Sequence, residues 1–203
     1  MKRRTFTNSQ IRYLKERAEE QYENMRGTRA YRNVEFLLYI LVVVLTALTI
    51  RSFLAEPIRV DGDSMIPTLV HNEDMLVEKV GYWFNDPQRG DIIICFYPGY
   101  TESCVKRVIG LPGETISVKE GAIFVNDVKL DESAYWQGEI IGDMDPVTVG
   151  SREIFVVGDN RNGSKDSRNA AVGCIPYAKV VGRVVAVVYP FHEFETFSRV
   201  IYH

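Results

Sequence analysis

Apolar and polar positions divide the chain into a polar N-terminal segment, a long apolar run and a body of short runs. The apolar run covers residues 34–54, and its only charged side chains, Glu35 and Arg51, lie near its two ends. About 20 helical residues cross the hydrocarbon core of a bilayer, and charged side chains near the ends can extend outward to the interfaces. The pattern therefore predicts a transmembrane anchor over residues 34–54.

Two other interpretations of the apolar run are weaker. A buried core helix of a soluble protein has a similar composition. A cleaved secretory signal fits less well, because the run begins far from Met1 and no small-x-small site follows it before Pro57. We therefore keep the single anchor as the prediction.

The segment before the anchor, residues 1–33, is basic. It carries nine Lys and Arg against four Glu, a balance of +5. Because Lys and Arg flanking a transmembrane helix favour the cytoplasmic side, we predict that residues 1–33 are cytoplasmic and that residues 55–203 lie across the membrane. An amphipathic helix is predicted over residues 9–26, since apolar side chains recur there at helical spacing, namely Ile11, Leu14, Ala18 and Met25.

From residue 55 to residue 203 the pattern changes to short β-type runs separated by turn residues, with hairpin-type turns at 120–121 and 126–127. Long amphipathic helices are missing there, which argues against a parallel α/β fold. We therefore predict a mainly β, antiparallel domain. Its predicted strands are residues 58–60, 74–80, 91–97, 105–109, 115–118, 122–125, 153–157 and 180–189. Residues 131–150 are the least periodic stretch and are predicted to be a surface insertion.

Charge and histidine positions limit the partners of this domain. Residues 52–203 carry 14 basic and 22 acidic side chains, a balance of −8, which argues against nucleic acid as a partner. His71, His192 and His203 are scattered along the chain and no CxxC motif occurs. We therefore predict neither a metal site nor a cofactor.

The three cysteines, Cys95, Cys104 and Cys174, lie in the domain predicted to face an oxidising compartment. One disulfide can form among them, and the sequence does not choose the pair. Buried free thiols are the alternative, which we favour.

One serine and one lysine have contexts that suit catalysis. Ser64 lies in GDSMIPTL, and a serine hydroxyl needs a nearby base to act as a nucleophile. The surroundings of Ser64 fit neither Gly-x-Ser-x-Gly nor Ser-x-x-Lys, and the histidines lie in ordinary settings, so a lysine base remains. Lys106 suits this role because apolar neighbours lower a lysine's pKa. Strand alternation predicts that Lys106 faces the core and Arg107 faces outward. Two basic residues on a solvated strand edge are the alternative.

Four motifs, in this order, resemble those of type I signal peptidases, which are membrane-anchored serine proteases with a Ser/Lys pair. The motifs are GDSMIPTL (62–69), RGDI (89–92), KR followed by GLPG (106–113), and GDNR followed by Ser164, Asp166, Ser167 and Arg168 (158–168). The similarity covers nearly all of residues 55–190 and the preceding anchor. The single anchor and short insertion resemble the smaller, Gram-positive type, which implies the β-domain of that family.

The resemblance implies roles for individual residues. Ser64 matches the nucleophile, and Lys106 matches the general base, which takes the serine proton and passes it to the leaving amine. Ser164 matches a serine that hydrogen-bonds to the lysine amine. Asp166 and Arg168 match a structural ion pair that holds this loop.

The resemblance also implies an oxyanion hole and substrate pockets. The backbone N–H of Ser64 is the implied oxyanion donor, whereas the second hydroxyl donor of some relatives is replaced here by Gly62. Family members cleave pre-proteins after Ala-x-Ala-like sites through two shallow apolar pockets. The matching pocket positions are Ile58, Val60, Met65, Leu69 and Cys104, for which ordinary core packing is the alternative. Residues 58–60 are also predicted to offer an edge to an extended substrate.

Two aromatic clusters, residues 82–84 and 191–197, are candidates for contact with the lipid bilayer, and we predict that one of them rests in the interface. Packing inside the β-domain is the alternative. The predicted function is a membrane-anchored endopeptidase that removes signal peptides from pre-proteins without metal or cofactor. A Ser/Lys protease with a dedicated substrate, and a β-module that only binds exported chains, are the other candidates.

Overall fold

The computed structural model describes residues 7–49, residues 55–197, Val200 and Tyr202. The chain forms two compact units, Met1–Ile50 and Arg51–His203. Each unit has its own secondary structure, and the candidate site lies within the second.

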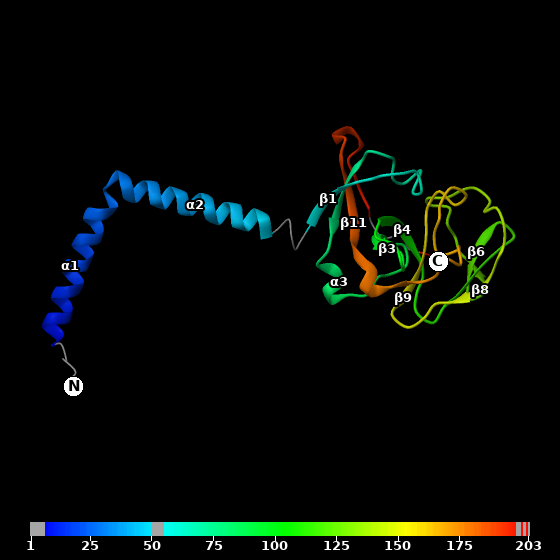
Figure 1. Ribbon diagram of the computed structural model, residues 1–203, viewed down its shortest axis with the longest axis horizontal. Coiled ribbons are helices and arrows are strands. Elements are labelled where there is room, and N and C mark those ends of the chain that lie inside the picture. Colours follow the sequence, from blue (N-terminus) through cyan, green and yellow to red (C-terminus); the bar gives the residue numbers. More distant parts are fainter. Residues whose placement is uncertain (1–6, 50–54, 198–199, 201, 203) are drawn as a thin grey trace. The chain divides into compact units, whose positions relative to one another are not determined.

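The first unit contains α1 (Asn8–Arg26) and α2 (Arg29–Thr49) (Figure 1). The Thr28 hydroxyl accepts a hydrogen bond from the Tyr31 backbone N–H at 3.2 Å, which caps the start of α2. Among the described residues, α2 is the one helix long and apolar enough to cross a membrane, and none of its side chains is buried. Helices are therefore confirmed over both predicted stretches, residues 9–26 and residues 34–49, and the membrane crossing of α2 stays a prediction. Residues 50–54 of the predicted anchor lie outside the described residues.

The second unit consists of two antiparallel sheets. In the first sheet the order is β1-β2-β11-β3-β4-β9-β10, with β12 paired to β11, and in the second it is β7-β6-β5-β8. The first sheet contains β1 (Ala55–Arg59), β2 (Asp74–Glu78), β3 (Ile92–Phe96), β4 (Ser103–Gly110), β9 (Glu153–Val157), β10 (Ile175–Pro176), β11 (Val180–Tyr189) and β12 (Glu195–Thr196). The second contains β5 (Thr115–Lys119), β6 (Ala122–Val125), β7 (Val128–Lys129) and β8 (Met144–Thr148). The predicted mainly β, antiparallel fold is confirmed.

Short helical turns complete the second unit, namely α3 (Gly81–Phe84), η2 (Tyr177–Lys179) and η3 (Phe191–Glu193). In Figure 1 the strands β6 and β8 of the second sheet lie to one side of β3, β4 and β9. The long strand β11 (orange in Figure 1) pairs with both β2 and β3, so that it joins the N-terminal hairpin to the centre of the sheet.

Strand β3 separates two core clusters, because alternate side chains of a strand point to opposite faces. Ile92 and Ile94 pack in a cluster with Val60, Met65, Leu69, Met75, Val77, Val184 and Val187. Ile93 and Cys95 pack in another, with Tyr97, Val108, Ile154, Val156, Val172 and Ile175. The central strands of the first sheet are thus covered on both faces.

Residues 131–150, predicted to be a surface insertion, are mostly exposed but also contribute to the fold. Strand β8 in this stretch pairs with β5, and the neighbouring Ile140 and Val149 are buried in a third core cluster beneath the second sheet. Glu132 is buried as well. Apolar alternation in the sequence does not predict β8, because β8 is an edge strand whose five residues are all exposed or only half-buried.

The two predicted hairpin turns are confirmed. Glu120 and Gly121 have φ angles of 52° and 72° between β5 and β6, and Asn126 and Asp127 have 50° and 64° between β6 and β7. Positive φ at both central residues matches the right-handed twist of a hairpin, and Gly, Asn and Asp tolerate it best.

Candidate active site

Strand β4 carries two adjacent buried cations at the centre of the first sheet. Lys106 is 2% exposed and Arg107 is 3% exposed. Because β4 lies between β3 and β9 and core clusters cover both of its faces, both side chains are almost fully buried. The solvated strand edge that was the alternative for this pair is therefore wrong, and so is the prediction that Arg107 faces outward.

The Lys106 amine lies beside the Ser64 hydroxyl. Lys106 Nζ donates hydrogen bonds to Ser64 Oγ at 2.8 Å and to the Val105 carbonyl at 2.7 Å. No carboxylate of the described residues forms an ion pair with this amine. Burial lowers the pKa of Lys106 below its usual value, although the nearby Cys104 and Asp166 charges act in the opposite direction. A lysine in this setting can hold an uncharged amine next to a hydroxyl.

Ser64 lies in the loop between β1 and β2, whose backbone is held by the loop after β9. Asn160 donates from its backbone N–H to the Ser64 carbonyl at 3.1 Å and from its side-chain amide to the Asp63 carbonyl at 3.0 Å. Gly62 has a φ of +97°, a conformation that side chains other than glycine rarely adopt. A hydroxyl-bearing residue at position 62 would therefore be strained in this backbone.

The loop after β9 is fastened by an ion pair. Arg168 donates from Nε to one oxygen of Asp166 and from Nη2 to the other, both at 2.8 Å. Asp166 also accepts the Gly158 N–H at 3.0 Å and is 1% exposed. A Cβ atom at Gly158 would lie 2.2 Å from Ser164 Oγ and 2.3 Å from the Ser64 carbonyl oxygen. The close approach of this loop to Ser64 therefore requires glycine.

Ser164 lies next to these groups but does not contact the lysine as the resemblance implied. Its hydroxyl is buried without a hydrogen-bond partner among the described residues. The Lys106 amine donates to Ser64 and to its own strand instead. The structure thus brings Ser164, Asp166 and Arg168 to the site, with Ser164 as an unpaired hydroxyl at its edge.

Arg107 lies on the opposite face of β4 from Lys106, and a carboxylate neutralises it. Arg107 Nε and Nη2 donate to the two oxygens of Asp159 at 2.8 and 2.6 Å, and Thr68 Oγ1 donates to Asp159 at 2.5 Å. Burial alone would lower the pKa of Arg107, but the hydrogen bonds and charge of Asp159 outweigh it and raise that pKa. Asp159, which is fully buried, therefore ties β4 to the loop that carries Ser64.

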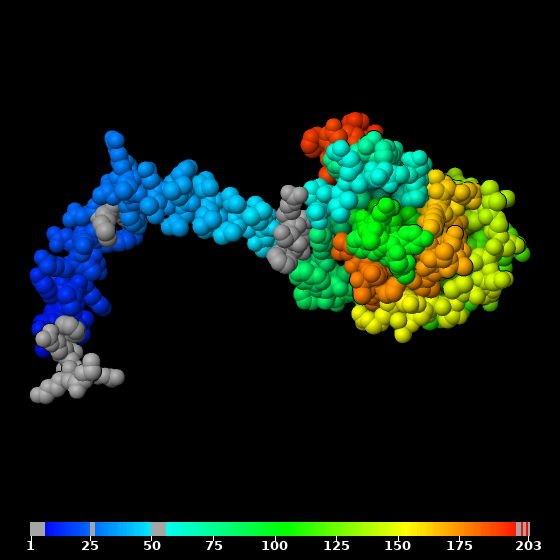
Figure 2. Space-filling model, viewed as in Figure 1, coloured from blue at the N-terminus to red at the C-terminus, as the bar shows by residue number. Residues whose placement is uncertain are grey.

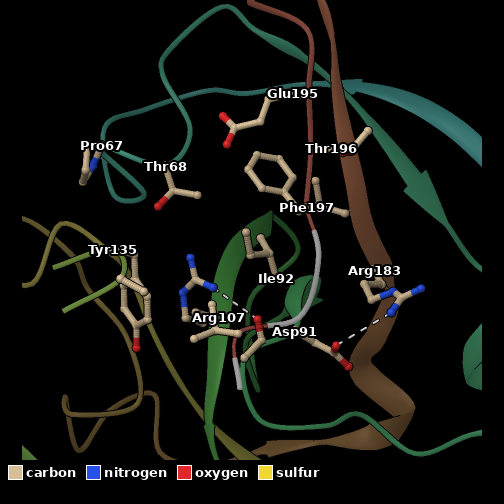
Figure 3. A pocket seen from close by; sticks show the side chains of 14 residues that line it. Pro67, Thr68, Asp91, Ile92, Arg107, Tyr135, Arg183, Glu195, Thr196 and Phe197 are labelled. Carbon is tan, nitrogen blue, oxygen red and sulfur yellow. Dashed lines mark hydrogen bonds and ion pairs between the residues drawn. The ribbon is translucent and has the colours of Figure 1, made fainter. Parts of the chain in front are cut away.

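The stretch predicted to be an insertion supplies two further contacts to this centre. The Tyr135 ring lies beside the Arg107 guanidinium, with its centroid 4.0 Å away (Figure 3). Glu132 forms a buried ion pair with Arg161, which in turn donates to the Gly158 carbonyl at 2.7 Å. These contacts connect residues 131–150 to the backbone beside Ser64.

Sequence reasoning missed five residues of this network, namely Thr68, Glu132, Tyr135, Asp159 and Arg161. Thr68, Asp159 and Arg161 lie within the quoted motifs, so the motifs were the available signal. Glu132 and Tyr135 had no signal, because their partners are distant in sequence.

The predicted pocket positions do not gather around one cavity. Val60, Met65 and Leu69 are buried in one core cluster, which Ile58 joins from its edge. Cys104 packs against the other cluster, on the opposite face of β3 and β4. For Val60, Met65 and Leu69 the structure therefore matches the alternative interpretation, core packing.

Two hollows adjoin the site. One of about 400 Å³ lies on the Arg107 side of β4 and is also lined by Thr68, Tyr135 and Phe197 (Figure 3). The other, of about 420 Å³, is lined by Ser164 and its neighbours up to Asn169 together with residues 140–144. Neither hollow includes Ser64 or Lys106. In the described part of the chain, no three His, Cys, Asp or Glu residues gather to hold a metal ion.

The site thus holds a buried lysine amine that is hydrogen-bonded to a serine hydroxyl, and comparison with known proteins identifies the family of the chain. The sequence model of the signal peptidases, peptidase S26, matches residues 33–189. Signal peptidase I of Leptolyngbya laminosa is 40% identical over 159 residues, which cover 74% of this chain and 76% of that protein. Signal peptidase I of Bacillus licheniformis is 38% identical over 168 residues, covering 78% and 90%. Signal peptidase I T of Bacillus subtilis (strain 168) is 39% identical over 163 residues, covering 76% and 84%.

The chain belongs to the signal peptidase family, peptidase S26. A solved structure of a signal peptidase I from Enterococcus faecalis V583 is 34% identical to this chain. The matched region covers 49% of this chain and 97% of the Enterococcus chain, with a TM-score of 0.40. Relatives from Bacillus agree with the resemblance to the short, Gram-positive type.

Proposed function

We propose that this chain is a membrane-anchored serine endopeptidase in which Ser64 is the nucleophile and Lys106 the general base. Membership of the signal peptidase family makes it a peptidase that cleaves signal peptides. The observation that carries the finer assignment is the 2.8 Å hydrogen bond between Lys106 Nζ and Ser64 Oγ, made by an amine whose pKa is lowered by burial.

In the proposed mechanism, the uncharged Lys106 amine accepts the Ser64 proton as Ser64 Oγ attacks the scissile carbonyl. The resulting ammonium donates this proton to the leaving amine, and the signal peptide remains as an ester on Ser64. Lys106 then takes a proton from water, whose oxygen attacks the ester carbonyl, and returns that proton to Ser64 Oγ as the bond between Oγ and the signal peptide breaks. The anion that forms at the carbonyl oxygen is stabilised by the Ser64 N–H, which donates to no acceptor within the described part of the chain.

Gly62 contributes backbone conformation instead of a hydroxyl donor in this proposal. Its positive φ shapes the turn that leads into Ser64. Asp166 and Arg168 act on the reaction indirectly, because their ion pair fixes Gly158 against the Ser64 backbone. Ser164 is a positioning residue whose free hydroxyl can receive the Lys106 amine once the serine is acylated.

The proposed substrates are exported pre-proteins with Ala-x-Ala-like cleavage sites. β1 is an edge strand that pairs only with β2 among the described strands, so its other edge can accept an extended peptide by main-chain hydrogen bonds. Ile58, half-buried on β1, can contact a small side chain of such a peptide, with Val60, Met65 and Leu69 forming the floor beneath it. Cys104 is proposed to line the groove from the side of Lys106.

We propose that residues 34–54 anchor the protein once in the bilayer, with residues 1–33 in the cytoplasm and residues 55–203 outside. The apolar helix α2 and the +5 balance of the N-terminal segment support this orientation. The acyl-enzyme chemistry needs neither metal nor cofactor, because the serine and the lysine supply nucleophile and base.

Of the two aromatic clusters, we propose that Trp83 and Phe84 of α3 rest in the bilayer interface. Their side chains are 62% and 78% exposed. Ala55, which follows the proposed anchor in sequence, pairs with Glu78 at the end of β2 that leads into α3. The other aromatic cluster follows Tyr189, which pairs with Asp74 at the opposite end of β2. Tryptophan at this depth lowers the free energy of the interface-bound state.

The two tryptophans of the chain, Trp83 and Trp136, allow a test of this contact. In full-length protein reconstituted with brominated lipids, the Trp136→Phe variant should show strong fluorescence quenching, because Trp83 is its only tryptophan. The Trp83→Phe variant is the matched control and should show little quenching. Equal quenching in the two variants would refute the assignment to α3.

Cleavage itself is tested with the detergent-solubilised full chain and a pre-protein that carries an Ala-x-Ala site. The wild type should release the signal peptide, and Ser64→Ala and Lys106→Ala should not. If either variant retains wild-type cleavage, the Ser/Lys assignment is wrong. If the wild type binds the pre-protein but cleaves nothing, the chain is a binding module instead.

A further inference from the structure

Two of the three cysteines face each other across β3 and β4. Cys95 and Cys104 are direct partners in the β3–β4 register, and their Sγ atoms lie 3.7 Å apart. Facing residues of antiparallel strands have Cα atoms about 4.5–5.5 Å apart, which is within the range of about 4.4–6.8 Å that a disulfide spans. Both residues are thiols in this structure. Rotation of the side chains can therefore join them without separating the strands.

The two thiols differ in access and acidity. Cys95 is fully buried, whereas Cys104 is half-buried at the end of the exposed β3–β4 connection, which is green in Figure 2. A hydrogen bond from Cys95 outweighs burial and lowers the pKa of Cys104 to about 7. The hydrogen bond with Cys104, burial and the Cys104 charge raise the pKa of Cys95. Cys104 is thus the accessible thiolate and Cys95 its buried neighbour.

We propose that Cys104 is a thiol modification site that reacts with low-molecular-weight disulfides, and that Cys95 resolves the product to a Cys95–Cys104 disulfide beside Lys106. In the first step the Cys104 thiolate attacks one sulfur of RSSR, the S–S bond of the reagent breaks, and RS⁻ leaves and takes a proton from water. In the second step Cys95 attacks the Cys104 sulfur, the bond to the R–S group breaks, and the Cys95 proton goes to the leaving group. Two protein thiols and RSSR give one protein disulfide and two RSH.

Cys174 is not part of this pair. It packs against the third core cluster beneath the second sheet, away from Cys95. Burial raises the pKa of Cys174, which makes it a poor thiolate. It therefore provides a matched control in the same molecule.

The disulfide changes the charge next to Lys106. Cys104 and Lys106 lie two residues apart on the same face of β4. The titratable groups whose charges act on Lys106 are Cys104 on β4, Cys95 on β3 and two carboxylates in the loop after β9. Of these carboxylates, Asp159 is the one that pairs with Arg107 on the opposite face of β4, and Asp166 is the other. A thiolate at Cys104 favours the ammonium form of Lys106, whereas a disulfide carries no charge. Oxidation therefore enlarges the uncharged fraction of Lys106, a consequence that rests on the proposed function.

The disulfide is tested by intact mass. The full chain in detergent micelles is treated with oxidised glutathione, then unfolded in denaturant together with an alkylating reagent, so that every remaining thiol reacts. The wild type should lose two hydrogen atoms, retain no glutathione and carry one alkyl group, at Cys174. Cys95→Ser should keep glutathione on Cys104, Cys104→Ser should form neither product, and Cys174→Ser should form the disulfide as the wild type does. A stable glutathione adduct on Cys104 of the wild type, or alkylation of both Cys95 and Cys104, would overturn the proposal.

The link to Lys106 is tested by the pH profile of pre-protein cleavage. The acidic limb for the oxidised wild type should lie at lower pH than for the reduced wild type, by up to about one unit. Cys174→Ser should show the same shift. Identical profiles in both redox states would refute the link to Lys106. A chain that cleaves in neither state would refute the proposed function, while the mass measurement would still decide the disulfide.

Discussion

The two faces of β4 hold adjacent cations in opposite electrostatic states. Lys106 and Arg107 are nearly equally buried. Within the described part of the chain Lys106 has no carboxylate partner and its pKa is lowered, whereas Arg107 is paired with Asp159 and its pKa is raised. Burial acts on both side chains in the same direction. The difference therefore comes from Asp159, a carboxylate in the loop after β9 that pairs with Arg107. It separates Lys106, which can exchange a proton, from Arg107, which cannot.

This contrast also separates catalysis from stability. A buried ion pair contributes little net stability, but removing one partner leaves an uncompensated charge and is costly. An uncharged buried amine is not part of an ion pair, so its removal leaves no uncompensated charge behind. We therefore expect changes at Lys106 to affect the reaction and changes at Arg107 to affect folding.

The largest expected effect is the loss of activity in Lys106→Met, which keeps the length of the side chain and removes the amine. Without the base, kcat/KM for pre-protein cleavage should fall by about 10²–10⁴-fold. The free energy of unfolding should stay equal or rise, because a polar group no longer has to be buried. Lys179→Met, on the exposed turn η2, is the control and should cleave like the wild type. A Lys106→Met protein that is less stable but fully active would contradict the comparison.

Next in size is the loss of stability in Arg107→Met. This variant leaves the Asp159 carboxylate buried without its cation, which should lower the free energy of unfolding by about 3–5 kcal/mol in denaturant titrations of the full chain. Arg59→Met is the matched control, because Arg59 makes a similar two-point contact with Asp74 at the surface, and it should cost much less. Adding Asp159→Leu to Arg107→Met should restore part of the loss. If Arg107→Met and Arg59→Met lower the free energy of unfolding equally, burial of the Arg107–Asp159 pair does not increase the cost of removing its cation.

A smaller effect is expected at Tyr135, whose ring covers the Arg107 guanidinium. Tyr135→Leu removes this cation–π contact and the hydroxyl bond to Tyr202, and should lower the free energy of unfolding by about 1–2 kcal/mol. Tyr135→Phe keeps the ring and should lose less. If the Leu and Phe variants lose the same amount, the ring does not stabilise Arg107.

The smallest effect is the pH dependence of stability. The pKa of Lys106 is lower in the folded protein than its usual value of 10.5, so the unfolded chain binds more protons between the two values. The free energy of unfolding therefore rises with pH through this window, and the contribution is lost as pH falls toward the folded pKa. The slope should be shallower in Lys106→Met. A slope that the substitution leaves unchanged would mean that another group titrates there.

The sequence predicted the anchor helix and the antiparallel fold well, because both depend on local patterns. Apolar alternation marks the central strands, and turn residues mark the hairpins at Gly121 and Asn126. Ser64 and Lys106 could be selected because their motifs occur together in the order that resembles the family, whereas Lys106 and Arg107 alone would have fitted a solvated strand edge.

The remaining features depend on contacts between distant segments. The orientation of Arg107 was predicted incorrectly, since alternation assumes that one face of a strand is solvated and β4 is covered on both. The role of residues 131–150 was missed because Glu132 and Tyr135 bind arginines that are remote in sequence. The pocket positions were assigned by likeness alone, and three of them, Val60, Met65 and Leu69, serve as core.

The central claim is that the Lys106 amine, which lies beside Ser64, loses its proton at a lower pH than an ordinary lysine. The most direct measurement is an NMR titration of the lysine side-chain signals of the full chain in micelles, with the Lys106 signal assigned by its absence in Lys106→Met. The account predicts a midpoint for Lys106 clearly below the usual lysine pKa, and a downward shift of the acidic limb when Cys95 and Cys104 are oxidised. A midpoint at or above 10.5 would contradict the account, because Lys106 would then be an ammonium that cannot accept the Ser64 proton.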